Sequence, residues 1–174
     1  MDTKQIIDWF GMQPNDAEGG YFAATYTSSL LIDGKDLPGF KPIKGRRPIC
    51  GAIYYFLDPQ GFSAMHSVTG DMIYHFYSGD PVQMLLLYPD NFPNRYEVCV
   101  FSNDIASGGS PMKVIPGGSW LGSRLITGGN YALMGVTMSP GFDPADYQIG
   151  KRKDLIRQYP EQKGLIEQLT RGQK

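Results

Sequence analysis

Residues 61–79 read GFSAMHSVTGDMIYHFYSG, and this stretch decides the class of fold. It contains two runs rich in apolar residues, 62–68 and 71–77, separated by the turn signal Thr69-Gly70. Similar runs recur at 49–57, 81–88, 95–101, 112–115, 119–126 and 130–138, each bounded by Gly, Pro, Asp or Asn. No helical period separates them, so we expect an all-β sandwich or barrel rather than a βαβ fold.

The two ends of the chain have a different pattern. Residues 3–10 place Ile6, Ile7 and Phe10 on one helical face, which Asp2 or Thr3 can cap and Gly11 can end. Residues 20–27 have the composition of a further strand, and residues 29–48 form a long connection with a small hairpin expected around Asp33-Gly34. Segments 154–159 and 162–169 have helical spacing, interrupted by a proline. We therefore expect one domain over 1–174, with an N-terminal helix in 1–12, the β structure in 20–150 and C-terminal helices in 151–171.

Composition narrows the partners of the chain. Its 174 residues carry a formal charge of −1, with no long run of one sign, so neither nucleic acid nor an anionic membrane surface is an expected partner. The polar start at 2–5 and the lack of a long apolar run predict a cytoplasmic protein that does not enter the membrane. Cys50 and Cys99 lie in strand-like runs and are expected to be buried free thiols.

A second string, VIPGGSWL at 114–121, accompanies the first. Together they resemble the two signature motifs of the cupin superfamily, and the chain is similar to its fifth family, as a divergent member. EGGYF at 18–22 and AIYYFL at 52–57 support the resemblance, which spans nearly the whole chain. The resemblance implies a jelly-roll barrel, which is also called a double-stranded β-helix. It also implies a homodimer. Dimer pairing would cover open sheet edges.

The motifs depart from those of metal-binding cupins, which the resemblance implies would place ligands at four positions. These positions hold His66, Val68, Met72 and Leu121. Valine and leucine have no donor atom, and a thioether does not suit iron or manganese. We therefore expect no standard metal site and no cofactor; a divalent metal is disfavoured. His75 is a weak substitute, because strand parity places it opposite Met72.

His66 is the first candidate for the site, as a general base or a hydrogen-bonding group in the cavity, or else as an inherited residue without chemistry. Glu18 is the one candidate for a partner carboxylate, and its alternative role is to cap a loop. Met72 is expected in an apolar cavity wall.

Aromatic residues complete the set of expected ligand contacts. Tyr74 and Tyr54 alternate with apolar neighbours on strands that line a barrel, where each either faces the ligand or belongs to the core. Trp120 either stacks on a ligand or plugs the barrel.

Four functions remain open at this stage. The leading hypothesis is a metal-independent cupin that binds a small organic ligand, carbohydrate-like or carboxylate-bearing, at His66 and nearby aromatic residues. The second is a metal-independent isomerase or epimerase with His66 as the base. A metal-dependent oxygenase and an interaction module with a vestigial pocket are the other two. The fold alone does not choose among them.

Overall fold

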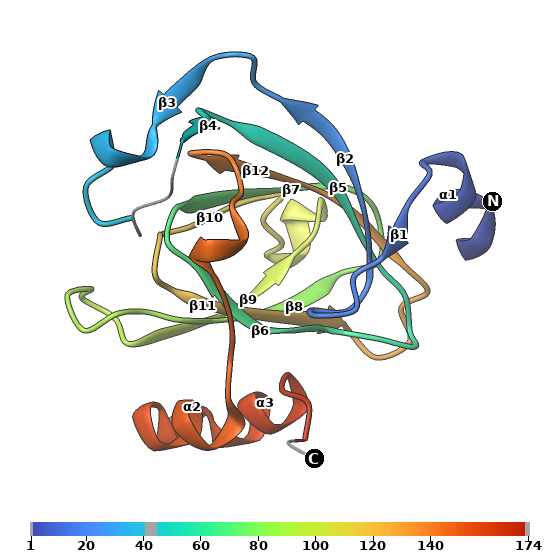
Figure 1. Ribbon diagram of the computed structural model, residues 1–174. Coiled ribbons are helices and arrows are strands. Elements are labelled where there is room, and N and C mark those ends of the chain that lie inside the picture. The colour runs from blue at the N-terminus through green and yellow to red at the C-terminus, as the bar shows by residue number, and fades with distance from the viewer. Residues whose placement is uncertain (1, 41–44, 173–174) are drawn as a thin grey trace.

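Two antiparallel sheets face each other in the computed structural model, which describes residues 2–40 and 45–172 (Figure 1). Met1 and the last two residues of the expected domain lie outside the described residues. The first sheet has the order β1-β2-β5-β12-β7-β10 and the second the order β13-β6-β11-β8-β9. A separate pair joins β3 to β4. The expected all-β jelly-roll barrel is confirmed.

The strands follow the alternating runs of the sequence closely. In the first sheet they are β1 (Gln13–Pro14), β2 (Tyr21–Thr27), β5 (Gly51–Leu57), β12 (Ala132–Ser139), β7 (Asp71–Gly79) and β10 (Met112–Ile115). In the second they are β13 (Tyr147–Ile149), β6 (Ser63–Val68), β11 (Trp120–Leu125), β8 (Val82–Leu87) and β9 (Tyr96–Phe101). The small pair is β3 (Leu31–Asp33) and β4 (Arg46–Pro48).

The main core lies between the two sheets. On β7 the side chains of Met72, Tyr74 and Phe76 point inward, while Ile73 and His75 alternate with them on the other face. The inner residues pack against Met84 and Leu86 of β8, Met134 and Val136 of β12, and Leu121 of β11. Each fully buried side chain of this size stabilises the fold by roughly 1.5–3 kcal/mol before entropy is counted.

Helix α1 (Thr3–Trp9) packs on the outside of the first sheet. The Asp2 carboxylate accepts from the Gln5 amide and the Gln5 side chain accepts from the Asp2 amide, which forms a capping box. Ile6 and Phe10 lie against Phe56. The helix predicted from the spacing of its apolar residues is confirmed, and Gly11, with φ at +59°, follows its end.

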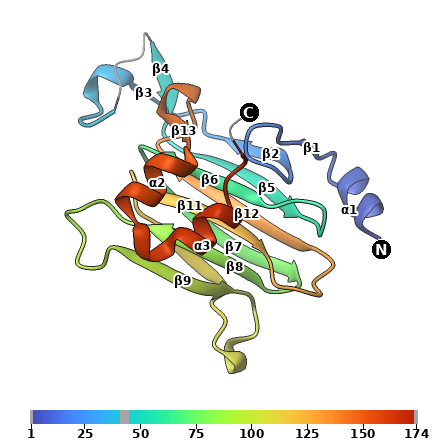
Figure 2. The same ribbon diagram turned by 90° about the horizontal axis from the view of Figure 1, so that it is seen from below.

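Helices α2 (Arg152–Gln158) and α3 (Lys163–Gln168) cover the outer face of the second sheet (Figure 2). Leu155, Ile166 and Leu169 pack there against Met65 and Leu87. A short 3-10 turn, Pro160–Gln162, separates the helices because proline ends the first of them. No helix among the described residues is long and apolar enough to cross a membrane.

Several elements were not predicted from the sequence. β1 and β13 are too short to show an alternating pattern, and they exist because β2 and β6 offer them an edge. The expected hairpin at Asp33 is present as the β3–β4 pair, in which Asp33 lies opposite Arg46, but a long connection joins the strands. Short 3-10 turns occupy Gly34–Asp36, Ile105–Ser107 and Pro144–Asp146. Cys50 and Cys99 are free, as expected, but partly exposed rather than buried.

Candidate functional site

A cavity of about 490 Å³ opens between the two sheets. Strands β2, β5, β6, β7, β12 and β13 contribute to its wall, together with the turn before β2 and the loop after β12. The wall is mostly apolar and aromatic. Its residues include Asn15, Glu18, Phe22, Ala24, Tyr55, His66, Val68, Met72, Tyr74, Phe142 and Tyr147. A cavity of this size is within the range that holds a small organic molecule.

Glu18 reaches the cavity because two glycines follow it. Gly19 has φ at +109° and Gly20 has φ at +68°, both in the region that favours glycine. A Cβ on Gly19 would lie 2.2 Å from the carbonyl oxygen of Phe62, and one on Gly20 would lie 2.5 Å from that of Phe56. The tight turn therefore requires both glycines, and it holds Glu18 against β6.

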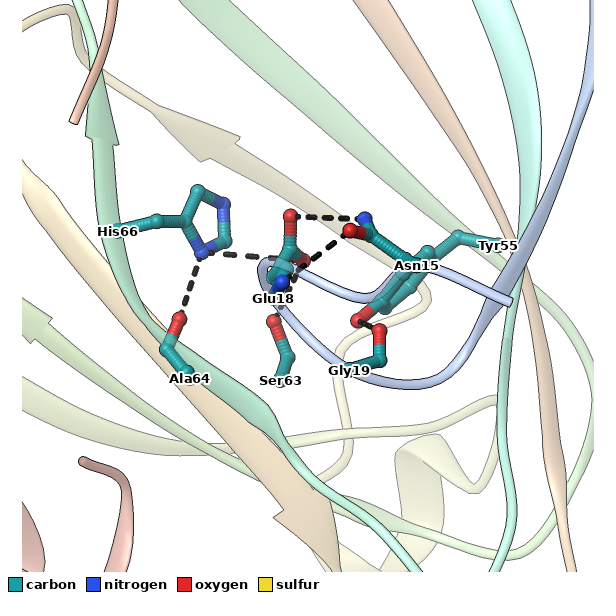
Figure 3. Close-up of polar contacts among 7 residues, drawn as sticks. All are labelled: Asn15, Glu18, Gly19, Tyr55, Ser63, Ala64 and His66. Carbon is teal, nitrogen blue, oxygen red and sulfur yellow. Dashed lines mark hydrogen bonds and ion pairs between the residues drawn. The ribbon is translucent and has the colours of Figure 1, made fainter. Parts of the chain in front are cut away.

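The Glu18 carboxylate is buried and only partly satisfied. Ser63 Oγ donates to Oε1 at 2.7 Å, and Asn15 Nδ2 lies 3.4 Å from Oε2. The amide of Ala64 donates to the Glu18 carbonyl at 2.8 Å, which ties the turn to the strand. In Figure 3 Glu18 lies between His66 and Asn15. Since a carboxylate can accept about four hydrogen bonds, acceptor capacity remains on Oε2.

His66 lies beside this carboxylate. Its Nδ1 is 2.9 Å from the carbonyl oxygen of Ala64 and 3.7 Å from Glu18 Oε1 (Figure 3). Because a carbonyl oxygen can only accept, Nδ1 carries the proton. Nε2 has no hydrogen-bond partner among the described residues, and the ring lines the cavity. A neutral His66 therefore presents its basic nitrogen away from the strand.

Three tyrosines share the cavity with this pair: Tyr55 and Tyr74 are buried, and Tyr147 is half-buried. Burial raises the pKa of Tyr55 and Tyr74 well above the ordinary value, and the negative charge of Glu18 raises it further. The pKa of Tyr147 is also raised, first by burial and then by Glu18. The Tyr55 hydroxyl donates to the Gly19 carbonyl at 2.7 Å.

Tyr147 is the tyrosine best placed to meet a ligand. Its ring stacks on His66 with centroids 5.8 Å apart and an interplanar angle of 20°. Its buried hydroxyl has no partner among the residues that the structure describes. Such a group is costly to bury unless something bonds to it.

Four of the predicted site residues meet in this cavity: His66, Glu18, Met72 and Tyr74 all line it. The structure confirms the predicted alternation along β7: Met72 and Tyr74 face inward, and His75 faces outward. His75, predicted as a weak candidate for a ligand contact, does not line this cavity, because its side chain lies on the outer face of β7, opposite Met112 and Gly135.

Two further predictions of cavity position are wrong for the same reason. Tyr54 lies on the outer face of β5 under α1, with its ring 4.7 Å from that of Phe10. Its neighbour Tyr55 faces the cavity instead. Trp120 packs on the outer face of β11 with the C-terminal helices, since Leu121 takes the inner face. At these two positions a helix lies on the outer face, so the aromatic side chain is partly buried there as well.

Four residues of the site were not predicted from the sequence: Tyr147, Tyr55, Ser63 and Asn15. Tyr55 was detectable in part, as the other member of a Tyr-Tyr pair. Tyr147 is in β13, a strand without a sequence pattern of its own. Asn15 and Ser63 become partners of Glu18 only through the fold.

The cupin fold implies a metal ion in many relatives, and the residues present do not fit one. Of the four positions that the motifs match, Val68 offers no donor, and Leu121 lies in the core, away from the cavity. Met72 offers only a thioether, and His66 has Nδ1 engaged with a carbonyl. The described residues contain no group of three or more His, Cys, Asp or Glu that could hold an ion. The metal-free state stays a prediction.

Comparisons with known proteins agree with the architecture. The family described as "Cupin superfamily (DUF985)" matches residues 4–150. A hypothetical protein from Leishmania major superposes with a TM-score of 0.85 at 22% identity, covering 99% of this chain and 100% of that one. A protein from Shewanella oneidensis gives 0.84 at 23% identity, with 99% of both chains covered.

A cupin 2 domain-containing protein from Halorhodospira halophila superposes less closely, with a TM-score of 0.56 at 11% identity over 90% of this chain and 86% of that one. No curated protein matches the chain. At such identities the structural likeness concerns the fold alone.

Proposed function

The chain belongs to the cupin superfamily, in the family described as DUF985, and on that premise we propose that it binds a small organic molecule in its cavity, beside His66 and Glu18. The observation that carries the proposal is a set of incompletely partnered polar atoms in an otherwise apolar cavity. These atoms are Nε2 of His66, Oε2 of Glu18 and the hydroxyl of Tyr147. A few convergent polar groups among apolar ones are typical of ligand sites.

The chemistry of the wall favours one of the two expected ligand classes. A carbohydrate-like ligand can donate hydroxyl protons to Glu18 and His66, accept from Tyr147, and lay its apolar face on an aromatic ring. A carboxylate-bearing ligand would instead bring a second negative charge near Glu18, in a cavity where burial makes repulsion strong. The carbohydrate-like class is therefore preferred.

A thermal-shift screen of metal-free protein against sugars, polyols, amines and small carboxylates tests the proposal. A ligand that binds the folded state raises Tm by mass action. The variant Ala24→Trp places a large side chain at an exposed position of the cavity wall. It should fold and lose the shift in Tm. Ala106→Trp, at an exposed position away from the cavity, is the matched control and should keep it. The proposal fails if no compound raises Tm or if both variants respond alike.

A metal-independent proton transfer of the isomerase or epimerase type is the second candidate. The favouring observation is the geometry of His66: the Ala64 carbonyl fixes the tautomer and Glu18 lies 3.7 Å from the same nitrogen, which leaves Nε2 as a base. Tyr74 and Tyr147, whose raised pKa values keep them protonated, are the candidate acids. His66→Gln should abolish exchange of a substrate α-proton with solvent deuterium, while ligand-induced stabilisation is at most weakened. Exchange that persists in this variant excludes His66 as the base.

A further inference from the structure

The charge of the cavity wall is a feature that the proposed function leaves unused. Glu18 is the one acidic side chain among the described lining residues, and no lysine or arginine is among them. Its side chain is only 10% exposed. A single carboxylate therefore sets the electrostatic potential inside an apolar cavity, where charges act more strongly than in water.

Two arginines in this part of the molecule, Arg47 and Arg171, form no ion pair with this carboxylate among the described residues. Arg47 is buried beside the cavity, but its guanidinium pairs with Asp146 at 2.5 Å. Arg171 comes close to Gly19, yet it donates to the carbonyl of Asp16 and forms no ion pair with Glu18 among the described residues. The proton on His66 Nδ1 is shared with the Ala64 carbonyl. Among the described residues, therefore, no lysine or arginine forms an ion pair with Glu18, and the basic side chain recorded beside its carboxylate is that of His66, with Nδ1 3.7 Å from Oε1.

Aromatic rings surround the same space. Phe22 and Phe142 line the cavity together with Tyr55, Tyr74 and Tyr147. The faces of such rings carry negative potential and attract a cation that lies over them. Glu18 is the second cause, after burial, of the raised pKa of all three tyrosines, and Arg171 lowers the pKa of Tyr147.

We infer that the cavity recognises a positively charged nitrogen, an ammonium or quaternary ammonium group that lies between the Glu18 carboxylate and the aromatic rings. This inference rests on the proposed function and specifies its ligand: an amine-bearing molecule, carbohydrate-like or not, and never a simple carboxylate. The ammonium completes the partners of Oε2, and its apolar substituents contact the rings.

Three probes of one shape and different charge test the inference. Choline is the cation. Its uncharged carbon isostere is 3,3-dimethylbutan-1-ol, and the anion of similar bulk is 3,3-dimethylbutanoate. Binding of each to the full chain is measured by calorimetry and by ligand-observed NMR at one fixed pH. We expect choline to bind at least about tenfold more tightly than the alcohol, and the anion more weakly than either.

The variant Glu18→Gln keeps an acceptor for Ser63 and removes the charge, so it should reduce the preference for choline over the alcohol to about twofold or less. Glu97→Gln is the matched control, because Glu97 is a partly buried carboxylate that contacts Tyr88 and Lys113 away from the cavity. It should keep the full preference. The comparison of probes on the unmodified chain stands even if Glu18→Gln does not fold.

The experiment can overturn the inference without overturning the proposed function. Equal binding of the alcohol, a preference for the anion, or no binding of choline each overturns the inference. The proposed function survives any of these results as long as some compound in the wider screen binds in a manner that Ala24→Trp abolishes. If no compound of any charge binds, both are overturned.

Discussion

Glu18 and His66 lie side by side because each is held by its own local structure, a turn in one case and a hydrogen bond in the other. The Gly19-Gly20 turn holds Glu18, and the hydrogen bond from Nδ1 to the Ala64 carbonyl holds the His66 ring. Ser63 and Ala64 connect the turn to β6, since the Ser63 hydroxyl donates to the Glu18 carboxylate and the Ala64 amide donates to the Glu18 carbonyl. The separation of the two side chains therefore depends on backbone geometry, and glycine is the residue whose replacement disturbs it most.

Replacing Gly19 by alanine should lower the free energy of unfolding by about 1–3 kcal/mol more than replacing Gly45 by alanine. The two glycines have similar φ angles, +109° and +104°, so their intrinsic backbone strain cancels in the comparison. A Cβ on Gly19 would lie 2.2 Å from a carbonyl oxygen, whereas one on Gly45 would have no described residue within 4 Å apart from its chain neighbours. Urea denaturation of both variants measures the difference. Equal costs would mean that the turn has room to relax.

At the scale of elements, the helices bury part of the outer face of each sheet. On the second sheet α2 and α3 do so through Ile166, which is fully buried and packs with Met65 and Leu85. These helices contact the sheet on the side away from the cavity. They should therefore contribute stability without contributing to binding.

Ile166→Ala should lower the free energy of unfolding by about 2–4 kcal/mol, because the large side chain leaves a cavity in a packed interface. The affinity of the cavity for its ligand should change less than twofold. Gln168→Ala, at an exposed position of α3, is the control and should be within about 0.5 kcal/mol of the unmodified chain. Chemical denaturation and calorimetry separate the two effects. Loss of binding in Ile166→Ala would show that the helices shape the cavity.

At the scale of the whole molecule, the barrel interior keeps phenols uncharged. The pKa of Tyr55 and Tyr74 is raised in the folded chain, first by burial, whereas an unfolded tyrosine has its pKa near 10. A group whose pKa is raised on folding stabilises the fold fully below the unfolded value. This contribution is lost as the pH rises above about 10.

The ionisation of these tyrosines should therefore leave the free energy of unfolding nearly unchanged up to about pH 9. Above pH 10 the free energy of unfolding should fall by about 1.4 kcal/mol per pH unit for each buried phenol. Tyr74→Phe should show a shallower fall than the unmodified chain. Tyr77→Phe, at an exposed position, is the control and should follow the unmodified chain. Denaturation curves from pH 7 to pH 11 test this. Parallel curves for Tyr74→Phe and the unmodified chain would contradict it.

The assembly of the molecule is a further expectation at this scale. β10 ends the first sheet and β9 ends the second. Apart from the bridge between Phe101 and Ser110 at the end of β9, neither outer edge pairs with another described strand. Their outward side chains include Val98, Val100, Met112 and Val114, all substantially exposed. Light scattering should give twice the 19.3 kDa mass of one chain if the expected homodimer forms. A mass near 19.3 kDa would rule it out.

The local sequence determined the longer strands, the helices and the class of fold, but not β1 and β13. An alternating run such as 71–77 needs only its own neighbours to predict a strand, and the family motifs placed His66 and Met72 in the barrel. The Glu-Gly-Gly segment also had a local signal, because two glycines after a carboxylate indicate a turn. These features depend on backbone preferences and period, which act over a few residues.

Only the tertiary structure decided which face of each strand is the inner one where both faces are apolar. Tyr54 and Tyr55 have the same side chain in adjacent positions, and α1 buries the outer one, so hydrophobicity alone cannot orient β5. Trp120 was misplaced for the same reason, under α2 and α3. The contact of Glu18 with His66, and the unpartnered hydroxyl of Tyr147 beside them, arise from segments far apart in the chain. Their proximity is a property of sheet pairing, which no local pattern contains.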